Sequence, residues 1–336
     1  MSITIVDVAR EAGVSRTTVS NVFNGKQKYS EETRQAVLEA ARRLGYRPNL
    51  AAKSLITNHS NLIGLILPSY VNQNTLTTSP FYNIVMDGVY SVLQHARDYD
   101  LIIYSVPDRA RLSQINDWIA SRTVDGVLAI GEFEPGFLQE INARSIPVVL
   151  IDNYQETHPN FSYINSEDEN GGYLATRRLI ESGYTQIALC AVSPLRTSPL
   201  MQKRCAGYRQ AVREAGLAER IIEGDGGTPF ETGKKFASGF VEQQIDAVFC
   251  LEDMLAVGVL HALLEQGVRV GQDFGLVGFD NLSIGWQVVP ELTTIDQNIF
   301  AKGEIATRTL LSLLKEEILP STRQILPVTL VRRKTA

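Results

Sequence analysis

The sequence predicts a small all-α head joined by a hinge to an α/β body of two doubly wound parallel-sheet lobes. Short helical patterns fill the first part of the chain, and a polar stretch follows them. From there to the C-terminus, apolar strand-like runs alternate with amphipathic helical runs, which is typical of parallel sheets covered by helices. With 336 residues, 44% of them hydrophobic, the chain can form more than one core. We therefore expect a head over residues 1–47, a hinge over 48–60 and a body over 61–336.

The head pattern predicts three helices, over residues 5–12, 16–24 and 31–44. Gly13 breaks the first helix, and Ser15 is placed to cap the second. Two short helices joined by a glycine-containing turn are typical of a helix-turn-helix, which lays its second helix in the major groove of DNA. A helical hairpin with a solvated polar face is the alternative interpretation.

The charge distribution favours a polyanionic partner for the head. The net charge is −5, yet residues 1–60 carry more Lys and Arg than Asp and Glu, so the acidic excess belongs to the rest of the chain. The second predicted helix turns Arg16, Thr17, Ser20 and Asn21 outward. Arginine can bind guanine, asparagine can bind adenine, and hydroxyl groups suit phosphates or base edges.

The run TIVDVAREAGVSRTTVSNVFN over residues 4–24 resembles the DNA-binding head of the LacI/GalR family of bacterial repressors. The resemblance continues through LGYRPN at 44–49, GFDN at 278–281 and PELTTI at 290–295, and so spans nearly the whole chain. It implies a helix-turn-helix head on a type I periplasmic-binding-protein-like effector domain. It also implies a sequence-specific DNA-binding repressor that is controlled by a small molecule bound between two lobes.

The resemblance implies a set of DNA contacts in the head and hinge. They are Thr4, Ser15, Arg16, Thr17, Thr18, Ser20, Asn21, Lys28, Thr33, Lys53 and Leu55. The hinge is too short to hold as an isolated helix. In the family the matching segment orders when two subunits pair on DNA, and a leucine matching Leu55 wedges into the minor groove. An ordinary flexible linker is the alternative. Because a helix-turn-helix dimer binds two half-sites related by its own symmetry, we expect a homodimer on a near-palindromic operator.

In the body, we expect strands over 62–67, 101–106, 126–130, 146–151, 187–192, 247–251 and 275–279. The expected helices are 81–97, 170–182, 202–216, 230–242, 253–266 and 300–316. The resemblance implies three crossings between the lobes, near 153–165, 281–298 and 320–326.

The ligand site is expected beyond the carboxyl ends of the strands. Acidic residues follow the apolar runs there, and aromatic residues lie nearby. Since carboxylates accept hydrogen bonds from hydroxyl groups and aromatic rings pack on the C–H face of a sugar, the pattern favours a sugar or sugar derivative. The effector-binding candidates are Phe81, Tyr82, Asp152, Arg204, Glu252, Asp280 and Trp286. Arg204 and Asp280 match effector-contacting residues of the family, although any one acid here could instead be a helix cap. Many relatives have Asn-Asp where this chain has Glu252-Asp253, so Glu252 adds a negative charge.

Other classes of protein lack support in the sequence. Four histidines and three cysteines are scattered without metal-ligand or disulfide spacing, and no nucleophile or phosphate-loop motif stands at a strand–helix junction. We therefore expect no cofactor, no metal and no enzymatic activity. The sequence also has no signal peptide and no membrane span, which favours a cytoplasmic protein. A regulator responsive to a nucleobase or another metabolite, and a sugar-modifying enzyme, are the alternatives.

Overall fold

The computed structural model describes residues 3–23, 29–46, 59–68, 80–96, 98–106, 115, 119, 123–133, 135–143, 146–155, 161–315 and 321–336. The chain divides into two compact units, Met1–Asn61 and Leu62–Ala336, and each is described by itself. Among the described residues, no helix combines the length and the apolar character needed to cross a membrane.

The described residues of the first unit form three helices, as the sequence predicts. They are α1 (Ile5–Glu11), α2 (Arg16–Phe23) and α3 (Glu31–Leu44). Their apolar faces form one core of Val8, Ala9, Val19, Val22, Val37, Ala40 and Ala41. The turn between α1 and α2 passes through Gly13, whose φ of 65° suits a residue without a Cβ. Ser30 caps α3 by accepting a hydrogen bond from the backbone N–H of Thr33.

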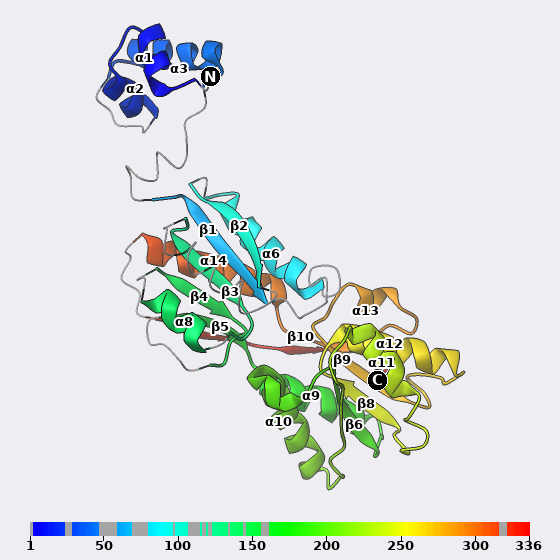
Figure 1. Cartoon of the computed structure of the whole chain (residues 1–336). Coiled ribbons are helices and arrows are strands. Elements are labelled where there is room, and N and C mark those ends of the chain that lie inside the picture. The colour runs from blue at the N-terminus through cyan, green and yellow to red at the C-terminus, as the bar shows by residue number, and fades with distance from the viewer. Residues whose placement is uncertain are drawn as a thin grey trace. The chain divides into compact units, whose positions relative to one another are not determined.

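The second unit contains two six-stranded sheets, one in each lobe (Figure 1). The first sheet has the order β11-β5-β4-β3-β1-β2, with β1 (Leu62–Pro68), β2 (Asp100–Val106), β3 (Gly126–Ile130), β4 (Val148–Ile151), β5 (Ser162–Ser166) and β11 (Arg323–Leu326). The second has the order β12-β10-β9-β8-β6-β7, with β6 (Ile187–Ala191), β7 (Ile221–Glu223), β8 (Ala247–Cys250), β9 (Gly275–Phe279), β10 (Thr293–Asp296) and β12 (Thr329–Val331). Within the described ranges the strands pair in parallel, apart from the antiparallel pair of β10 and β12. The prediction of two parallel-sheet lobes is thus confirmed.

Helices cover both sheets. The first lobe has α6 (Pro80–Leu93), α8 (Pro135–Asn142) and α14 (Ile299–Leu314). The second has α9 (Asp168–Glu181), the 3-10 turn η1 (Leu195–Thr197), α10 (Pro199–Glu214), α11 (Pro229–Ala237), α12 (Asp253–Glu265) and α13 (Ile284–Gln287). Helices α9 and α10 touch backbone to backbone. A Cβ at Gly172 would collide with the carbonyl oxygen of Arg204, and one at Gly207 with that of Glu169.

The chain crosses between the lobes after β5, after β10 and between β11 and β12. The first and third crossings lie just after the ranges expected for them, and the second lies at the end of its range, at residues 297–298. Residues 162–166 still belong to the first sheet, because β5 pairs with both β4 and β11. Residues 284–287 and 293–296 are second-lobe elements, and residues 323–326 form β11. Figure 1 shows the C-terminal segment, in red, running between the two lobes.

Candidate functional site

A cavity of about 520 Å³ lies between the two lobes of the second unit. The ends of parallel strands from both sheets surround it, which is where ligands bind in open α/β sheets. Six of the seven effector-binding candidates line this cleft, namely Phe81, Tyr82, Asp152, Arg204, Glu252 and Asp280. The structure therefore brings these six candidates together in one cavity.

The expectation for Trp286 is wrong. This side chain is not part of the cavity lining, and the residue is 57% exposed. It lies in the short helix α13, where Ile284 packs on the hydrophobic core. Residues two apart in a helix point in nearly opposite directions, so the burial of Ile284 turns Trp286 outward.

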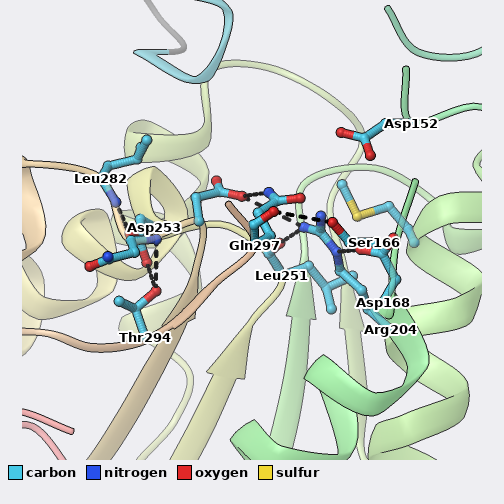
Figure 2. A network of polar contacts seen from close by, with 12 residues as sticks. Asp152, Ser166, Asp168, Arg204, Leu251, Asp253, Leu282, Thr294 and Gln297 are labelled. Atoms are coloured by element: carbon cyan, nitrogen blue, oxygen red, sulfur yellow. Dashed lines mark hydrogen bonds and ion pairs between the residues drawn. The ribbon is translucent and has the colours of Figure 1, made fainter. Parts of the chain in front are cut away.

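Arg204 is held rigidly in the cleft wall. It lies in the first turns of α10 and is only 3% exposed. Its Nε donates to Asp168 Oδ1 at 2.8 Å, and its Nη1 donates to the carbonyl oxygen of Leu251 at 2.6 Å (Figure 2). The guanidinium carbon also lies 3.6 Å from the centroid of the Phe279 ring. These contacts come from three different elements, so the donor has a fixed direction before any ligand arrives.

Asp280 follows β9 and has a φ of 121°, a conformation that residues with a side chain rarely adopt. Its Oδ1 accepts a 2.5 Å hydrogen bond from Gln297 Nε2 and lies 4.0 Å from Arg204 Nη1. Burial raises the pKa of Asp280 to about 6, although Arg204 acts in the opposite direction.

Asp253, the first residue of α12, fixes the loop that carries Asp280. Its Oδ2 accepts from the backbone N–H of Leu282 at 2.7 Å, and its Oδ1 accepts from Thr294 Oγ1 at 2.5 Å (Figure 2). The carboxyl group is completely buried, and burial raises its pKa. It therefore supports the site from behind and does not face the ligand space.

A buried lysine links the two lobes at the back of the cleft. Lys302 of α14 is wholly buried, and its Nζ donates to Asp152 Oδ1 and to Gln297 Oε1, each at 2.5 Å. Burial raises the pKa of Asp152, and Lys302 opposes this shift. Because Gln297 also donates to Asp280, one chain of polar contacts runs from the first lobe to the second.

Glu132 and Glu252 face the cleft from opposite lobes. Glu132 follows β3, and its Oε1 accepts a hydrogen bond from the backbone N–H of Leu200 at 3.1 Å. Glu252 precedes α12 at the N-cap position but makes no capping hydrogen bond with its side chain. Burial raises the pKa of both glutamates to about 7.

In the head, the expected DNA contacts fall into two groups. Thr4, Ser15, Thr18 and Thr33 make hydrogen bonds around helix N-termini, such as the 3.0 Å bond from the Thr18 N–H to Ser15 Oγ. Of the outward candidates on α2, Arg16 and Thr17 are exposed, and Ser20 and Asn21 are half-buried. Lys28, Lys53 and Leu55 lie outside the described residues.

Comparisons with known proteins decide the family. Residues 4–49 match the lacI family of bacterial regulatory proteins, and residues 176–336 match the periplasmic binding protein-like domain. The catabolite control protein A of Priestia megaterium is 31% identical to this chain over 97% of each protein. The HTH-type transcriptional repressor PurR of Vibrio campbellii is 34% identical over 94% of this chain and 92% of its own length. The chain belongs to the lacI family.

Solved structures of lacI-family proteins agree with this assignment. The lac repressor dimer bound to operator and the anti-inducer ONPF matches with a TM-score of 0.85 and 27% identity, over 100% of this chain and 99% of that one. The complex of the transcriptional regulator CelR with cellobiose matches with a TM-score of 0.74 and 27% identity, over 100% of both chains. As a member of the lacI family, the chain is a DNA-binding transcriptional regulator and not an enzyme. Within the described residues, no group of His, Cys, Asp and Glu could hold a metal ion.

Sequence reasoning missed three side chains that this lacI-family cleft depends on, namely Asp168, Gln297 and Lys302. No local sequence pattern identifies Asp168 or Gln297, because their contacts form only where the chain crosses between the lobes. Lys302, in contrast, could have been identified from the sequence. It stands one turn from Ile299 and Ala306 on the buried stripe of an amphipathic helix, where a lysine needs a buried acidic partner.

Proposed function

We propose that this chain is a repressor whose affinity for operator DNA is controlled by a sugar or sugar derivative bound in the cleft. The observation that carries the proposal is the composition of the cleft wall. It combines one immobilised guanidinium donor, Arg204, with carboxyl acceptors from both lobes and the aromatic residues Phe81 and Tyr82. Vicinal hydroxyl groups both donate and accept hydrogen bonds, so they satisfy such a wall better than a purely apolar ligand does. The cellobiose complex of CelR supports the same ligand class.

On the DNA side, we infer that residues 1–47 form the DNA-binding domain, 48–60 the hinge, and 61–336 the effector-binding and dimerisation domain. Arg16 and Asn21 would contact base edges, with Thr17 and Ser20 beside them. Thr4, Ser15, Thr18 and Thr33 would contact phosphates near helix N-termini. Lys28 and Lys53 would contact the DNA backbone, and Leu55 would enter the minor groove. The protein would act in the cytoplasm as a homodimer on a near-palindrome.

A ligand can control the arrangement of the lobes because the cleft residues belong to both of them. Asp152 belongs to the first lobe, whereas Arg204 and Asp280 belong to the second. A ligand that contacts all three stabilises one arrangement of the lobes over others, and a ligand shifts an equilibrium only by such differential binding. Effector coupling in allosteric proteins typically changes affinity by about 5–150-fold.

The test combines a ligand screen with a DNA-binding assay on the full chain. A thermal-shift screen of sugars, nucleobases and amino acids identifies ligands, and fluorescence anisotropy on a selected operator measures DNA affinity with each of them. We expect a sugar to raise the melting temperature and to change operator affinity by about 5–150-fold. A nucleobase or amino acid that does so in place of every sugar would overturn the sugar assignment. Ligands that bind without any change in operator affinity would overturn the proposed control of DNA binding by the ligand.

A further inference from the structure

The cleft has a marked excess of negative charge. Its lining holds the acids Glu132, Asp152, Asp225, Glu252 and Asp280, and Arg204 is the one basic residue among the lining residues that the structure describes. Asp225 is exposed, so solvent screens its charge. Of the other four acids, Asp152 and Asp280 are buried and Glu132 and Glu252 are half-buried, so solvent screens their charges less.

Ion pairs account for only some of these acids. Asp152 is paired with Lys302 at 2.5 Å. Arg204 is paired with Asp168 at 2.8 Å and reaches Asp280 only at 4.0 Å. Glu132 and Glu252 have no ion-pair partner among the described residues. Among the lining residues that the structure describes, Arg204 is thus the one cation, and two carboxylates already share it.

The two glutamates differ in how they are held. Glu132, from the first lobe, accepts a backbone hydrogen bond from Leu200 of the second lobe, so its carboxyl group spans the cleft. Glu252 comes from the opposite wall, and its carboxyl group has no hydrogen-bond donor among the described residues although it stands where a helix cap would. A carboxylate that neither caps a helix nor pairs with a basic residue has no partner for its negative charge within the protein. A cationic ligand can supply that partner.

We propose that the effector is a hydroxylated amine of the amino-sugar class, whose protonated nitrogen pairs with Glu252 and whose hydroxyl groups bind Arg204 and Asp280. This inference rests on the proposed function and narrows the ligand to a cationic one. Burial raises the pKa of Glu252, and a cation in the cleft would reverse the shift by stabilising the ionised form. A phosphorylated sugar would instead add negative charge to a wall that is already acidic and whose Arg204 guanidinium is already paired with Asp168.

The experiment compares sugars that share a ring and carry a positive charge, no charge or a negative charge. The full-length protein is titrated by calorimetry near pH 7 with glucose, glucosamine and glucose 6-phosphate, and with the same three forms of galactose and mannose. In at least one set we expect the amine to bind about tenfold or more tightly than its neutral counterpart, and the phosphate to bind most weakly.

Two variants make the assignment specific. Glu252→Gln keeps the shape of the side chain and should bring the amine and the neutral sugar to within about threefold of each other. Glu265 is exposed at the end of α12, the helix that Glu252 precedes, and the control variant Glu265→Gln should keep the full preference. The inference is overturned if a neutral or phosphorylated member binds most tightly in every set, if no member of any set binds, or if Glu252→Gln keeps the preference. A neutral sugar that binds more tightly than its amine in every set and alters operator affinity would overturn this inference alone and leave the proposed function standing.

Discussion

Arg204 Nε donates a 2.8 Å hydrogen bond to Asp168 Oδ1, and neither side chain is more than 4% exposed. Asp168 is the first residue of α9, so it stands where the chain has just crossed from the first lobe into the second. The hydroxyl group of Tyr154, in the first lobe, donates a second hydrogen bond to this carboxylate, at 2.5 Å from Asp168 Oδ2. The orientation of the Arg204 guanidinium in the cleft wall is therefore set by a residue at a lobe crossing.

Asp168→Asn should destabilise the protein and weaken ligand binding together. The change removes the charge that balances a buried guanidinium, and breaking such a pair costs about 3 kcal/mol or more. Urea unfolding measures the free energy of unfolding, and calorimetry measures ligand affinity. The exposed neighbour Glu169→Gln is the control and should change neither quantity appreciably. Unchanged ligand affinity in Asp168→Asn would show that Arg204 does not need this partner.

Asp280→Ala should abolish the response to ligand while leaving ligand-free operator binding intact. The side chain lines the cleft and is no part of the head. Anisotropy titrations of operator DNA with and without ligand measure the response. If the variant still responds fully, Asp280 supports the fold of the loop after β9, and the ligand contacts lie elsewhere in the cleft.

Arg16→Ala should relax base preference at one operator position, because a bidentate contact from arginine to guanine discriminates by about 1–3 kcal/mol. Binding to a panel of single-base operator variants measures that preference. Arg42→Ala, which removes an equally exposed charge from α3, is the control and should weaken binding evenly across the panel, if at all. An even loss in Arg16→Ala would make Arg16 a phosphate contact.

Glu252 should make the ligand-free protein less stable as the pH rises from about 4.5 to about 7. Burial, followed by the charge of Asp280 and opposed by Arg204, raises its pKa from 4.5 to about 7. Within that window the folded state keeps a proton that the unfolded state has lost, so raising the pH favours unfolding. The full effect is at most about 3 kcal/mol. Melting temperatures measured from pH 5 to pH 8 should fall less steeply for Glu252→Gln than for Glu265→Gln, and equal slopes would contradict the assignment.

Long and strongly patterned elements were predictable from the sequence. Strands β3 and β9 were predicted with the limits that the structure shows, because each is a continuous run of buried apolar residues. The helices of the head followed from capping residues and from Gly13. Strands β7, β11 and β12 were missed, since each is short and half-exposed and lies at a sheet edge. Strand β10 was missed although it is mostly buried, because its residues were assigned to a crossing between the lobes.

The candidate site was only partly predictable, for a different reason. Acidic residues that follow strands can be identified in the sequence as site candidates, because the carboxyl ends of parallel strands meet at one edge of the sheet. Partners such as Lys302 and Gln297 reach Asp152 and Asp280 only after the chain has crossed between lobes, and no local pattern specifies that pairing. Trp286 was misplaced because the rotation of the short helix α13 depends on which side Ile284 packs.

The threading of the chain through both lobes has a consequence for synthesis on the ribosome. Strand β11 forms the edge of the first sheet beside β5, and α14 packs on α6 of the same lobe, although both come from the last part of the chain. Strand β12, which closes the second sheet, is made later still. Neither lobe can reach its final form while the C-terminal segment is inside the exit tunnel. The head has no such dependence, so a nascent chain would present a folded head before it has a finished ligand cleft.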